Sequence, residues 1–230
     1  EQQFRNATSF LFESSWMAKL KNVQGGKWSP SSSLPLPSEK VAILVPYKER
    51  EEHLKMFLLI MHPFLQRQGL DYGIYVIEQY GDEPMFCKGL LYNIGYTLAK
   101  KDEGHDCFIF HDVDLIPESD ANIYSCQDTP SHLSVAIDVY NYTLPYEHFL
   151  GGVVAFTASQ YEQLNGYSNL FCGWGGEDDD MFLRLYKHRM ALSRLEEDVG
   201  RYKMMRHKRT PENPARHALL EAWAKRAGKD

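Results

Sequence analysis

Three short apolar runs separated by two amphipathic segments limit the fold of this chain more than any other feature. The runs are VAILVP from residue 41, YGIYVIEQ from residue 72 and DCFIFHDVD from residue 106. The first is rich in β-branched residues and ends at a proline, as buried strands often do. The segments between the runs have apolar residues at helical spacing. This alternation predicts an α/β fold, with a parallel sheet covered by helices.

The pattern becomes looser after Asp114. Two further apolar runs, LSVAI and GGVVAFT, predict short strands, and helices are expected over 158–164, 178–191 and the part of the tail that contains Trp223. Pro63 is expected to kink or split the first helix. Residues 24–38 are rich in Gly, Ser and Pro, so residues 1–40 are interpreted as a stem-like lead-in and residues 41–230 as one catalytic-size domain.

Composition excludes some classes of protein. The net charge of −6 argues against a general nucleic-acid binder, although residues 201–209 form a local basic patch. No apolar run approaches the roughly 20 residues that span a bilayer, so this piece is expected to be soluble. Four scattered cysteines are too few for a disulfide scaffold. Two glycosylation sequons, at Asn6 and Asn141, hint at a secretory compartment.

Three polar segments are expected to meet at one edge of the sheet. PYKER, EQYGDEPMF and HDVD follow the first, second and third strand. In open α/β sheets, ligands bind beyond the carboxyl ends of the strands. Asp112 and Asp114 lie two apart, so both carboxylates can face one site and hold a divalent cation that carries a diphosphate. The alternative is a polar strand end without a metal.

The segment FCGWGGEDDD places a tryptophan among glycines and then four consecutive carboxylates. One or two carboxylates at a helix N-terminus are explained by the helix dipole, but four adjacent ones repel one another. One of them could be a general base, with its neighbours holding substrate hydroxyls. Trp174 among its glycines could form a flap with a flat apolar face. Met204 and His207, from KMMRHKR, are interpreted on residue type alone as a core residue and a basic-patch residue.

The order of these motifs resembles that of the metazoan β-1,4-galactosyltransferase family. The likeness extends from about Gln24 to Leu220 and is carried by VPYKEREEHL, RQGLDYGIYVIEQ, FHDVDLIP, LPYEHFLGGV, NGYSNLFCGWGGEDDDMFLRL and GRYKMMRH. The resemblance implies a GT-A fold, with a Rossmann-like, mostly parallel twisted sheet. It also implies a type II membrane protein of the Golgi whose anchor is missing from this piece.

The resemblance assigns a role to individual positions. The implied Mn²⁺ ligands are Asp114, Met204 and His207, and the implied catalytic group comprises Asp178 as the base, Glu177 and Trp174. The implied UDP-sugar contacts are Pro46, Lys48, Arg50, Phe86, Lys88, Asp112, Val113 and Gly152. The implied acceptor-side and sugar contacts are Tyr146, Phe149, Asp179, Arg216, His217 and Leu220. Cys107 and Cys126 match a family disulfide, which leaves Cys87 and Cys172 free.

Several positions depart from the usual family pattern. Lys48 and Lys88 replace arginines, which exchanges a planar fork for a point charge. Other replacements are Cys87 for asparagine, Cys172 for an aromatic residue, Val139 for lysine, His217 for phenylalanine and Ser33 or a neighbour for cysteine. A C-terminal extension found in vertebrate members is also missing from this piece. Phe149 occupies the position that influences donor choice, so both UDP-galactose and UDP-N-acetylgalactosamine stay open as donors.

The implied activity is Mn²⁺-dependent transfer of galactose or N-acetylgalactosamine to the 4-hydroxyl of terminal β-N-acetylglucosamine, with inversion, on glycoproteins or glycolipids. The partners are therefore a nucleotide-sugar donor and a glycan acceptor, with no nucleic acid. The alternative is a degenerate member that binds sugar or nucleotide without turnover. A transferase that acts on xylose is less consistent with Met204, because that branch usually has histidine there.

Overall fold

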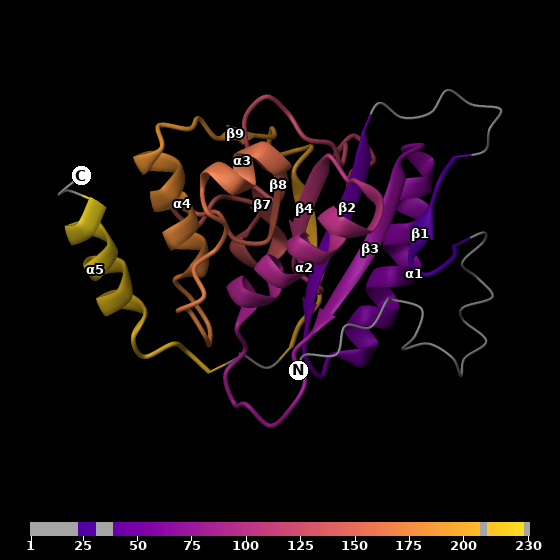
Figure 1. The fold of residues 1–230 in the computed structure, drawn as a ribbon. Helices are drawn as coiled ribbons and strands as arrows, with labels where there is room; N and C mark the ends of the chain where they lie inside the picture. The colour runs from indigo at the N-terminus through magenta and orange to yellow at the C-terminus, as the bar shows by residue number, and fades with distance from the viewer. Residues whose placement is uncertain (1–22, 31–38, 208–210, 228–230) are drawn as a thin grey trace.

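The computed structural model describes residues 23–30, 39–207 and 211–227. Its larger sheet has seven strands in the order β1-β3-β2-β4-β8-β6-β9, and its smaller sheet has the order β5-β10-β7 (Figure 1). The larger sheet contains β1 (Lys27–Trp28), β2 (Lys40–Tyr47), β3 (Asp71–Glu78), β4 (Cys107–His111), β6 (Ser131–His132), β8 (Val153–Thr157) and β9 (Ser193–Arg194). The smaller sheet contains β5 (Leu115–Pro117), β7 (Ala136–Ile137) and β10 (Arg201–Met204). The helices are α1 (Glu51–Arg67), α2 (Lys88–Glu103), α3 (Ala158–Gln163), α4 (Glu177–Lys187) and α5 (Arg216–Ala227), with a 3-10 turn over Asp138–Tyr140.

The three long strands at the centre are parallel, as the sequence predicts. β2 pairs with β3 along its whole length and with β4 from Val41 to Leu44. β8 then pairs antiparallel with β4, so the sheet is mixed. Residues 41–45 are fully buried, because helices cover both faces of the sheet.

Helix α1 covers one face and packs its residues Leu54, Phe57, Leu58, Met61 and Leu65 against alternate residues of β2. It continues through Pro63 as one helix, so the expected split does not occur. Buried side chains lie both before and after the proline, and their packing outweighs the lost backbone hydrogen bond.

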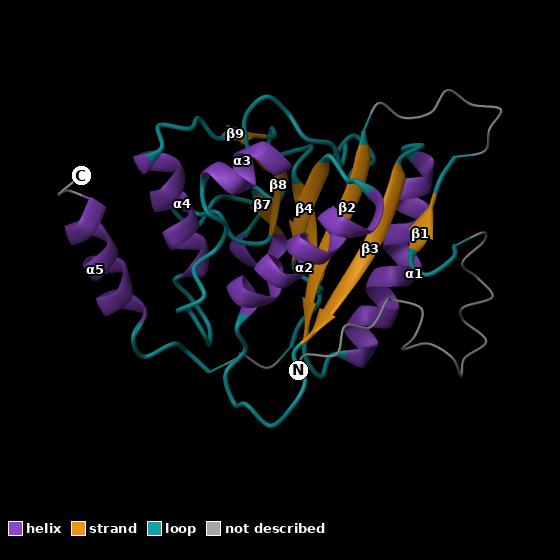
Figure 2. Cartoon of the chain, in the orientation of Figure 1, coloured by secondary structure: helices purple, strands orange, loops and turns teal. Residues whose placement is uncertain are grey.

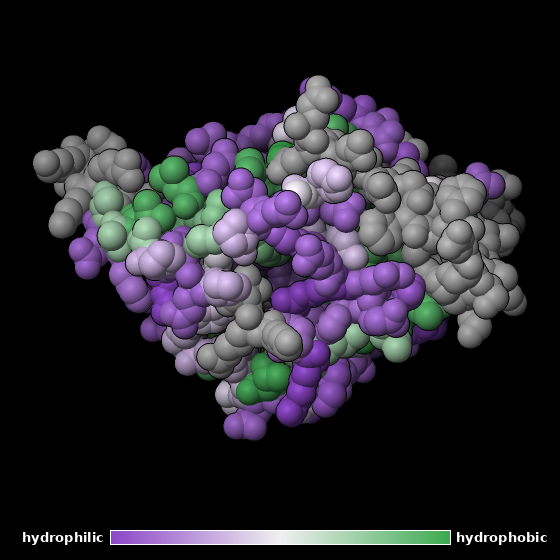
Figure 3. All heavy atoms as spheres, turned by 90° about the horizontal axis from the view of Figure 1, so that it is seen from below, coloured by the Kyte–Doolittle hydropathy of each residue, from purple (hydrophilic) through white to green (hydrophobic). Residues whose placement is uncertain are grey.

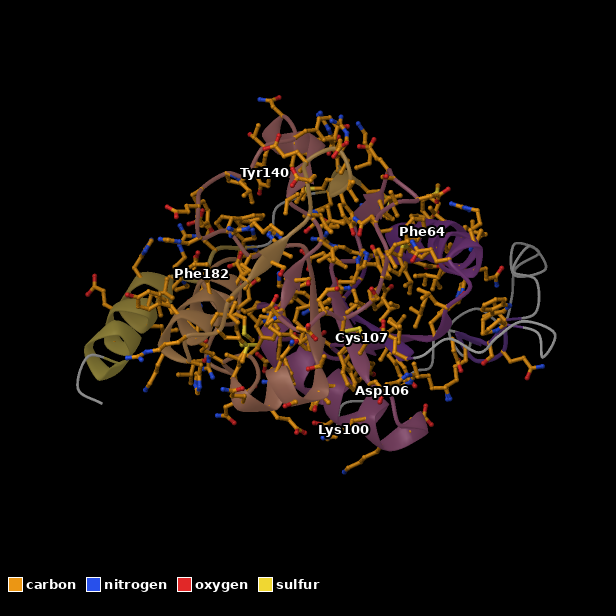
Figure 4. All side chains as sticks on the ribbon, turned by 90° about the horizontal axis from the view of Figure 1, so that it is seen from above. Phe64, Lys100, Asp106, Cys107, Tyr140 and Phe182 are labelled. Atoms are coloured by element: carbon orange, nitrogen blue, oxygen red, sulfur yellow. A yellow bond between two sulfur atoms is a disulfide. The ribbon has the colours of Figure 1, made fainter. Side chains whose placement is uncertain are left out.

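Helices α2, α3 and α4 cover the opposite face. They pack against Ala42 and Leu44 of β2 and against Phe108 and Phe110 of β4. Figure 4 shows the two layers: Phe64 of α1 and Lys100 of α2 lie on opposite sides of Cys107 in β4.

The chain after Asp114 has shorter elements than expected. The run LSVAI is not one strand, because β6 before it pairs with β8 and β9, whereas β7 at its end pairs with β10. The run therefore passes from the larger sheet to the smaller one. The helices expected over 158–164 and 178–191 are α3 and α4, and the expected tail helix is α5.

Part of the expected lead-in belongs to the sheet. Lys27 and Trp28 form β1, which pairs antiparallel with Gly73 and Tyr72 of β3. Ser33 lies outside the described residues. Within the described ranges, no helix has both the length and the apolar character needed to cross a membrane.

The carboxyl ends of β2 and β3 point toward one end of the molecule, at the bottom of Figure 2. Figure 3 views the molecule from that end and shows hydrophilic residues over much of this face. The loops that follow β2, β3 and β4 meet there, as the sequence predicts for a ligand site.

Candidate active site

The candidate metal centre lies where β5 and β10 pair, just after the end of β4. His207 Nε2 is 2.7 Å from Asp114 Oδ2, and an Arg50 guanidinium nitrogen is 3.5 Å from the same oxygen. Met204 pairs in register with Leu115, and the Met205 amide donates to the Asp114 carbonyl at 2.7 Å. The smaller sheet therefore brings His207 to Asp114 and places the Met204 backbone opposite Leu115, the residue after Asp114.

The charges at this centre suit a divalent cation. Burial alone would raise the pKa of Asp114, but His207 and Arg50 outweigh it and hold that pKa below its ordinary value. The carboxylate is thus ionised at neutral pH. A carboxylate and an imidazole fit a divalent ion of the Mn²⁺ type, whereas the Met204 thioether is a softer ligand than such an ion usually takes.

Lys88 links the second aspartate to the helix that carries the four carboxylates. Its ammonium lies 3.3 Å from Asp112 Oδ1 and 2.8 Å from Glu177 Oε1. Burial lowers the pKa of Lys88, but these two carboxylates more than compensate and hold it well above its ordinary value. Asp112 also accepts a hydrogen bond from the Tyr92 hydroxyl at 3.2 Å, and burial raises its pKa.

The four consecutive carboxylates at the start of α4 have four different surroundings. Glu177 pairs with Lys88, and its Oε2 is buried without a hydrogen-bond partner among the described residues. Asp179 accepts a hydrogen bond from the Tyr146 hydroxyl at 2.9 Å. Asp180 is 2% exposed and pairs with Arg184 at 2.7 Å, so it is part of an ion pair within the helix. Helix capping therefore does not explain the cluster, and the N-cap position itself is Gly176, with no side-chain cap.

Asp178 is the carboxylate whose pKa is best suited to proton transfer. Burial first, and the neighbouring Glu177 carboxylate second, raise the pKa of Asp178 to about 7. Lys88 acts in the opposite direction, as does a hydrogen bond from the Asp179 amide at 3.1 Å. A group with a pKa near the working pH can both hold and release a proton, as a general base must.

The segment 149–152 faces Asp178 and can lie close to it because residues 151 and 152 are glycines. A Cβ at Gly151 would lie 2.9 Å from Asp178 Oδ2 and 2.8 Å from the Phe149 ring, so only glycine fits. Gly152 has φ +93°, and its carbonyl accepts a hydrogen bond from the Asp112 amide at 3.1 Å. A larger residue at position 151 would push Phe149 and Asp178 apart, and one at position 152 would collide with Ser134 and Leu115.

Polar residues that the sequence analysis did not single out hold residues 147–151 through hydrogen bonds to their backbone carbonyl oxygens. His132 Nε2 lies 2.9 Å from the Gly151 carbonyl oxygen, and the Ser134 hydroxyl also donates to that oxygen. Arg194 donates to the carbonyl oxygens of Glu147 and Phe149, at 2.7 Å and 3.2 Å. No motif marks these residues, because each acts on a backbone oxygen that the sequence does not reveal.

Residues 173–176, called the Trp loop here, precede α4. Trp174 is 53% exposed, and the Arg216 guanidinium lies 5.1 Å from its ring centroid. Gly173, Gly175 and Gly176 all have positive φ, which explains why glycine is needed on both sides of the tryptophan. His217 and Leu220 lie on α5, which reaches the Trp loop through Arg216.

The other implied nucleotide contacts lie at the ends of β2 and β3 and beside β4. Pro46 is in β2 opposite Ile77, Val113 is buried next to the two aspartates, and Phe86 is partly buried in the loop before α2. The Lys48 ammonium donates to the Glu83 carbonyl of that loop instead of joining the carboxylate cluster.

The expectation that Cys87 and Cys172 are free is wrong. They form a disulfide, as do Cys107 and Cys126, where the resemblance implied one. The described residues contain no free cysteine. The first pair is separated by 85 residues in the sequence, so only the fold brings it together.

Comparison with known proteins agrees with the motifs. The family model for the N-terminal region of glycosyl transferase group 7 matches residues 4–127, and the model for the N-terminal domain of galactosyltransferase matches residues 131–208. β-1,4-Galactosyltransferase 4 of Cricetulus griseus is 47% identical over 90% of this chain and 61% of its own length. β-1,4-Galactosyltransferase 1 of Mus musculus is 49% identical over 82% of this chain and 47% of its own length. The chain thus spans about half to three-fifths of these relatives.

Two solved structures of Drosophila β-1,4-galactosyltransferase 7 have the same fold. One is a mutant in complex with manganese, UDP-Gal and xylobiose, with a TM-score of 0.68, 27% identity and coverage of 79% of both chains. The other is the catalytic domain with xylobiose, with a TM-score of 0.69, 27% identity and coverage of 80% of this chain and 79% of that one. The sheet therefore has the GT-A architecture. With two family models that together match most of its length, this chain belongs to the galactosyltransferases of glycosyl transferase group 7.

Proposed function

We propose that this protein is a Mn²⁺-dependent, inverting β-1,4-galactosyltransferase that transfers galactose from UDP-galactose to the 4-hydroxyl of a terminal β-N-acetylglucosamine. The observation that carries the proposal is that burial raises the pKa of the Asp178 carboxylate to about 7. It lies on the same helix as Glu177, which Lys88 connects to Asp112, two residues before Asp114 of the candidate metal centre. The candidate base and the candidate donor-side cation thus lie next to the segment that carries Asp114, which supports one site for donor, acceptor and ion.

Each part of the site has a proposed task. Asp178 takes the proton of the acceptor hydroxyl as that oxygen attacks the anomeric carbon of the donor. Glu177, with its unpaired carboxylate oxygen, accepts hydrogen bonds from the donor sugar. Asp179 and Tyr146 bind acceptor hydroxyls, and Trp174 covers the sugars and excludes water, so that transfer replaces hydrolysis.

The remaining residues bind the nucleotide and the ion. Mn²⁺ held by Asp114, Met204 and His207 would neutralise the charge that develops on the departing UDP. The proposed UDP contacts are Pro46, Lys48, Arg50, Phe86, Lys88, Asp112, Val113 and Gly152. Arg216, His217 and Leu220 are proposed to line the acceptor side next to the Trp loop.

The donor, the compartment and the domain division are part of the same proposal. UDP-galactose is favoured over UDP-N-acetylgalactosamine because the similar proteins are named galactosyltransferases. Two disulfides fit an oxidising compartment, such as the Golgi lumen. Residues 1–40 are proposed to include a stem that leads into the catalytic domain.

A donor screen tests the proposal. The purified chain is incubated with Mn²⁺, one N-acetylglucosamine acceptor and either UDP-sugar, and UDP release and product linkage are measured. We expect Mn²⁺-dependent β-1,4 transfer of galactose, and its loss in Asp178→Asn. Phe149→Tyr, measured in the same assay, tests whether this ring sets the donor preference. UDP binding by calorimetry without transfer from either donor would instead favour a member that binds nucleotide without turnover.

A further inference from the structure

The Cys87–Cys172 disulfide joins two segments that each lead directly into the site. Cys87 immediately precedes Lys88, the first residue of α2. Cys172 immediately precedes the Trp loop, residues 173–176. The two Cα atoms are 4.1 Å apart, so the disulfide holds the beginning of α2 directly against the beginning of the Trp loop.

Hydrogen bonds make the α2 side of this link a firm anchor. The Gln79 side chain donates to the Met85 carbonyl and accepts from the Cys87 amide, both at 2.8 Å. Gln79 in turn follows β3, and its amide donates to the Tyr47 carbonyl at the end of β2. Position 87 is therefore fixed to the two central strands of the sheet.

The Trp-loop side is attached to this anchor at its first residue. The Gly173 amide donates to the Phe86 carbonyl at 2.8 Å, next to the disulfide. Beyond it, Trp174 exchanges backbone hydrogen bonds with Pro211 and Asn213, at 2.8 Å and 3.0 Å. Those contacts are non-covalent and can open when the loop moves.

The far end of the loop returns to the next residue of α2. Glu177 directly follows the Trp loop and pairs with Lys88 at 2.8 Å. The two ends of the four-residue loop are thus attached to consecutive residues, one by a covalent bond to Cys87 and one by an ion pair with Lys88. An ion pair can exchange partners when a diphosphate arrives, whereas the disulfide cannot.

We propose that Cys87 and Cys172 are positioning residues whose disulfide is the fixed pivot of the Trp loop. The Lys88–Glu177 ion pair is the second attachment of the loop, and it can be released. This inference rests on the proposed function only in assigning the donor to Lys88 and the acceptor cover to Trp174. When Lys88 turns toward a diphosphate, the side-chain contact at Glu177 is released, and the pivot keeps Trp174 over the site. The positive φ values of Gly173, Gly175 and Gly176 let the loop turn between these two attachments.

The test compares two double variants. Cys87→Ser/Cys172→Ser removes the pivot, and Cys107→Ser/Cys126→Ser removes the other disulfide, which lies away from the Trp loop. Hydrogen exchange of amides 173–176 is measured without ligand and with UDP and Mn²⁺. We expect roughly tenfold faster exchange of these amides in the first variant, because the loop loses its fixed end. The second variant should lose thermal stability without this local change.

Kinetics supply a second, separable readout. For the first variant, the acceptor KM should rise by roughly fivefold to tenfold while kcat changes less, since a looser cover binds the acceptor less well. Unchanged exchange and unchanged acceptor KM in a folded variant would overturn the proposal. If the wild-type protein transfers no sugar, the proposed function fails, yet the exchange measurement still decides the role of the pivot.

Mild reduction of the wild-type protein replaces the variant if the serine pair does not fold. Both cysteines of the Cys87–Cys172 pair are partly exposed, whereas the second pair joins a partly exposed Cys126 to a fully buried Cys107. A low concentration of reductant should therefore open the first pair before the second. Alkylation and mass spectrometry identify the opened pair. Faster exchange confined to residues 173–176 in that species supports the proposal, and no change contradicts it.

Discussion

The two halves of the molecule position their site residues by different means. Up to the end of β4, the site residues follow strands that pair over many residues, with β2 and β3 aligned from end to end. After Asp112, they lie in loops, beside strands of two to five residues or in the first turns of α4 and α5, and a few side-chain contacts such as Arg194 to the Phe149 carbonyl hold the loops. Repeated backbone hydrogen bonds tolerate the loss of one, whereas a loop held by single contacts does not. Substitutions in the second half should therefore give separate effects on chemistry, stability and metal binding.

The largest effect is expected for Asp178→Asn. The amide cannot accept the acceptor proton, so kcat should fall by about 10² to 10⁴-fold. Steady-state kinetics with UDP-galactose measures the loss. Thermal unfolding and UDP affinity should stay close to wild type, and a retained kcat would remove Asp178 from the mechanism.

Asp180→Ala should show the opposite profile, two residues further along the same helix. It leaves Arg184 without its carboxylate partner in a buried setting, and breaking such a pair costs about 3 kcal/mol of unfolding free energy. Denaturant titration measures the change. Arg184→Met, made on the Asp180→Ala background, should recover part of the lost stability by removing the unpaired cation. An unchanged stability of Asp180→Ala alone would contradict the claim that this buried ion pair stabilises the fold.

His207→Ala tests the proposed metal-binding set, whose three residues all lie in the second half. Losing one ligand should raise the Mn²⁺ concentration for half-maximal binding by at least about tenfold. Isothermal titration with Mn²⁺ measures this directly, without depending on turnover. Arg206→Ala, at the exposed neighbouring position, is the matched control and should leave the affinity near wild type. Equal affinities in the two variants would exclude His207 as a ligand.

The smallest expected effect is a shift in pH dependence. Because Asp178 must be ionised to act as a base, kcat/KM should fall as the pH drops below about 7, the raised pKa of this group. The stability that this raised pKa contributes is present below its ordinary pKa and is lost as the pH rises through about 7. Glu177→Gln removes a neighbouring negative charge, so it should move the kcat/KM profile to lower pH. A profile that does not move would assign the titration to another group.

The sequence predicted the first half of the fold closely. Its apolar runs placed β2 and β3 within one residue of their observed bounds, and the helical spacing between the runs indicated α1 and α2, because each helix packs one apolar surface against the sheet. Pro63 was the exception, since the continuing core contacts on both sides of it cannot be read from a single residue type.

The second half was harder to predict. LSVAI reads as one strand, but the two residues before it pair in the larger sheet and its last two residues pair in the smaller one, and nothing local specifies that change. The motifs singled out the carboxylates of α4 and the two aspartates after β4, and in the structure Lys88 lies between Asp112 and Glu177. The motifs did not reveal the Cys87–Cys172 disulfide, although the position of each cysteine beside a site residue was a signal that could have been used.

The pairing of β5 with β10 has a consequence for how the protein is made. Asp114 precedes β5 and leaves the ribosome early, whereas Met204 and His207 arrive with β10, near the end of the described chain. The parallel strands can assemble from the N-terminal half during synthesis, long before β10 exists. If these three residues hold the ion as proposed, manganese affinity reports the last stage of maturation. A nascent chain that stops before Arg201 would contain the whole central sheet and still lack two of its three metal ligands.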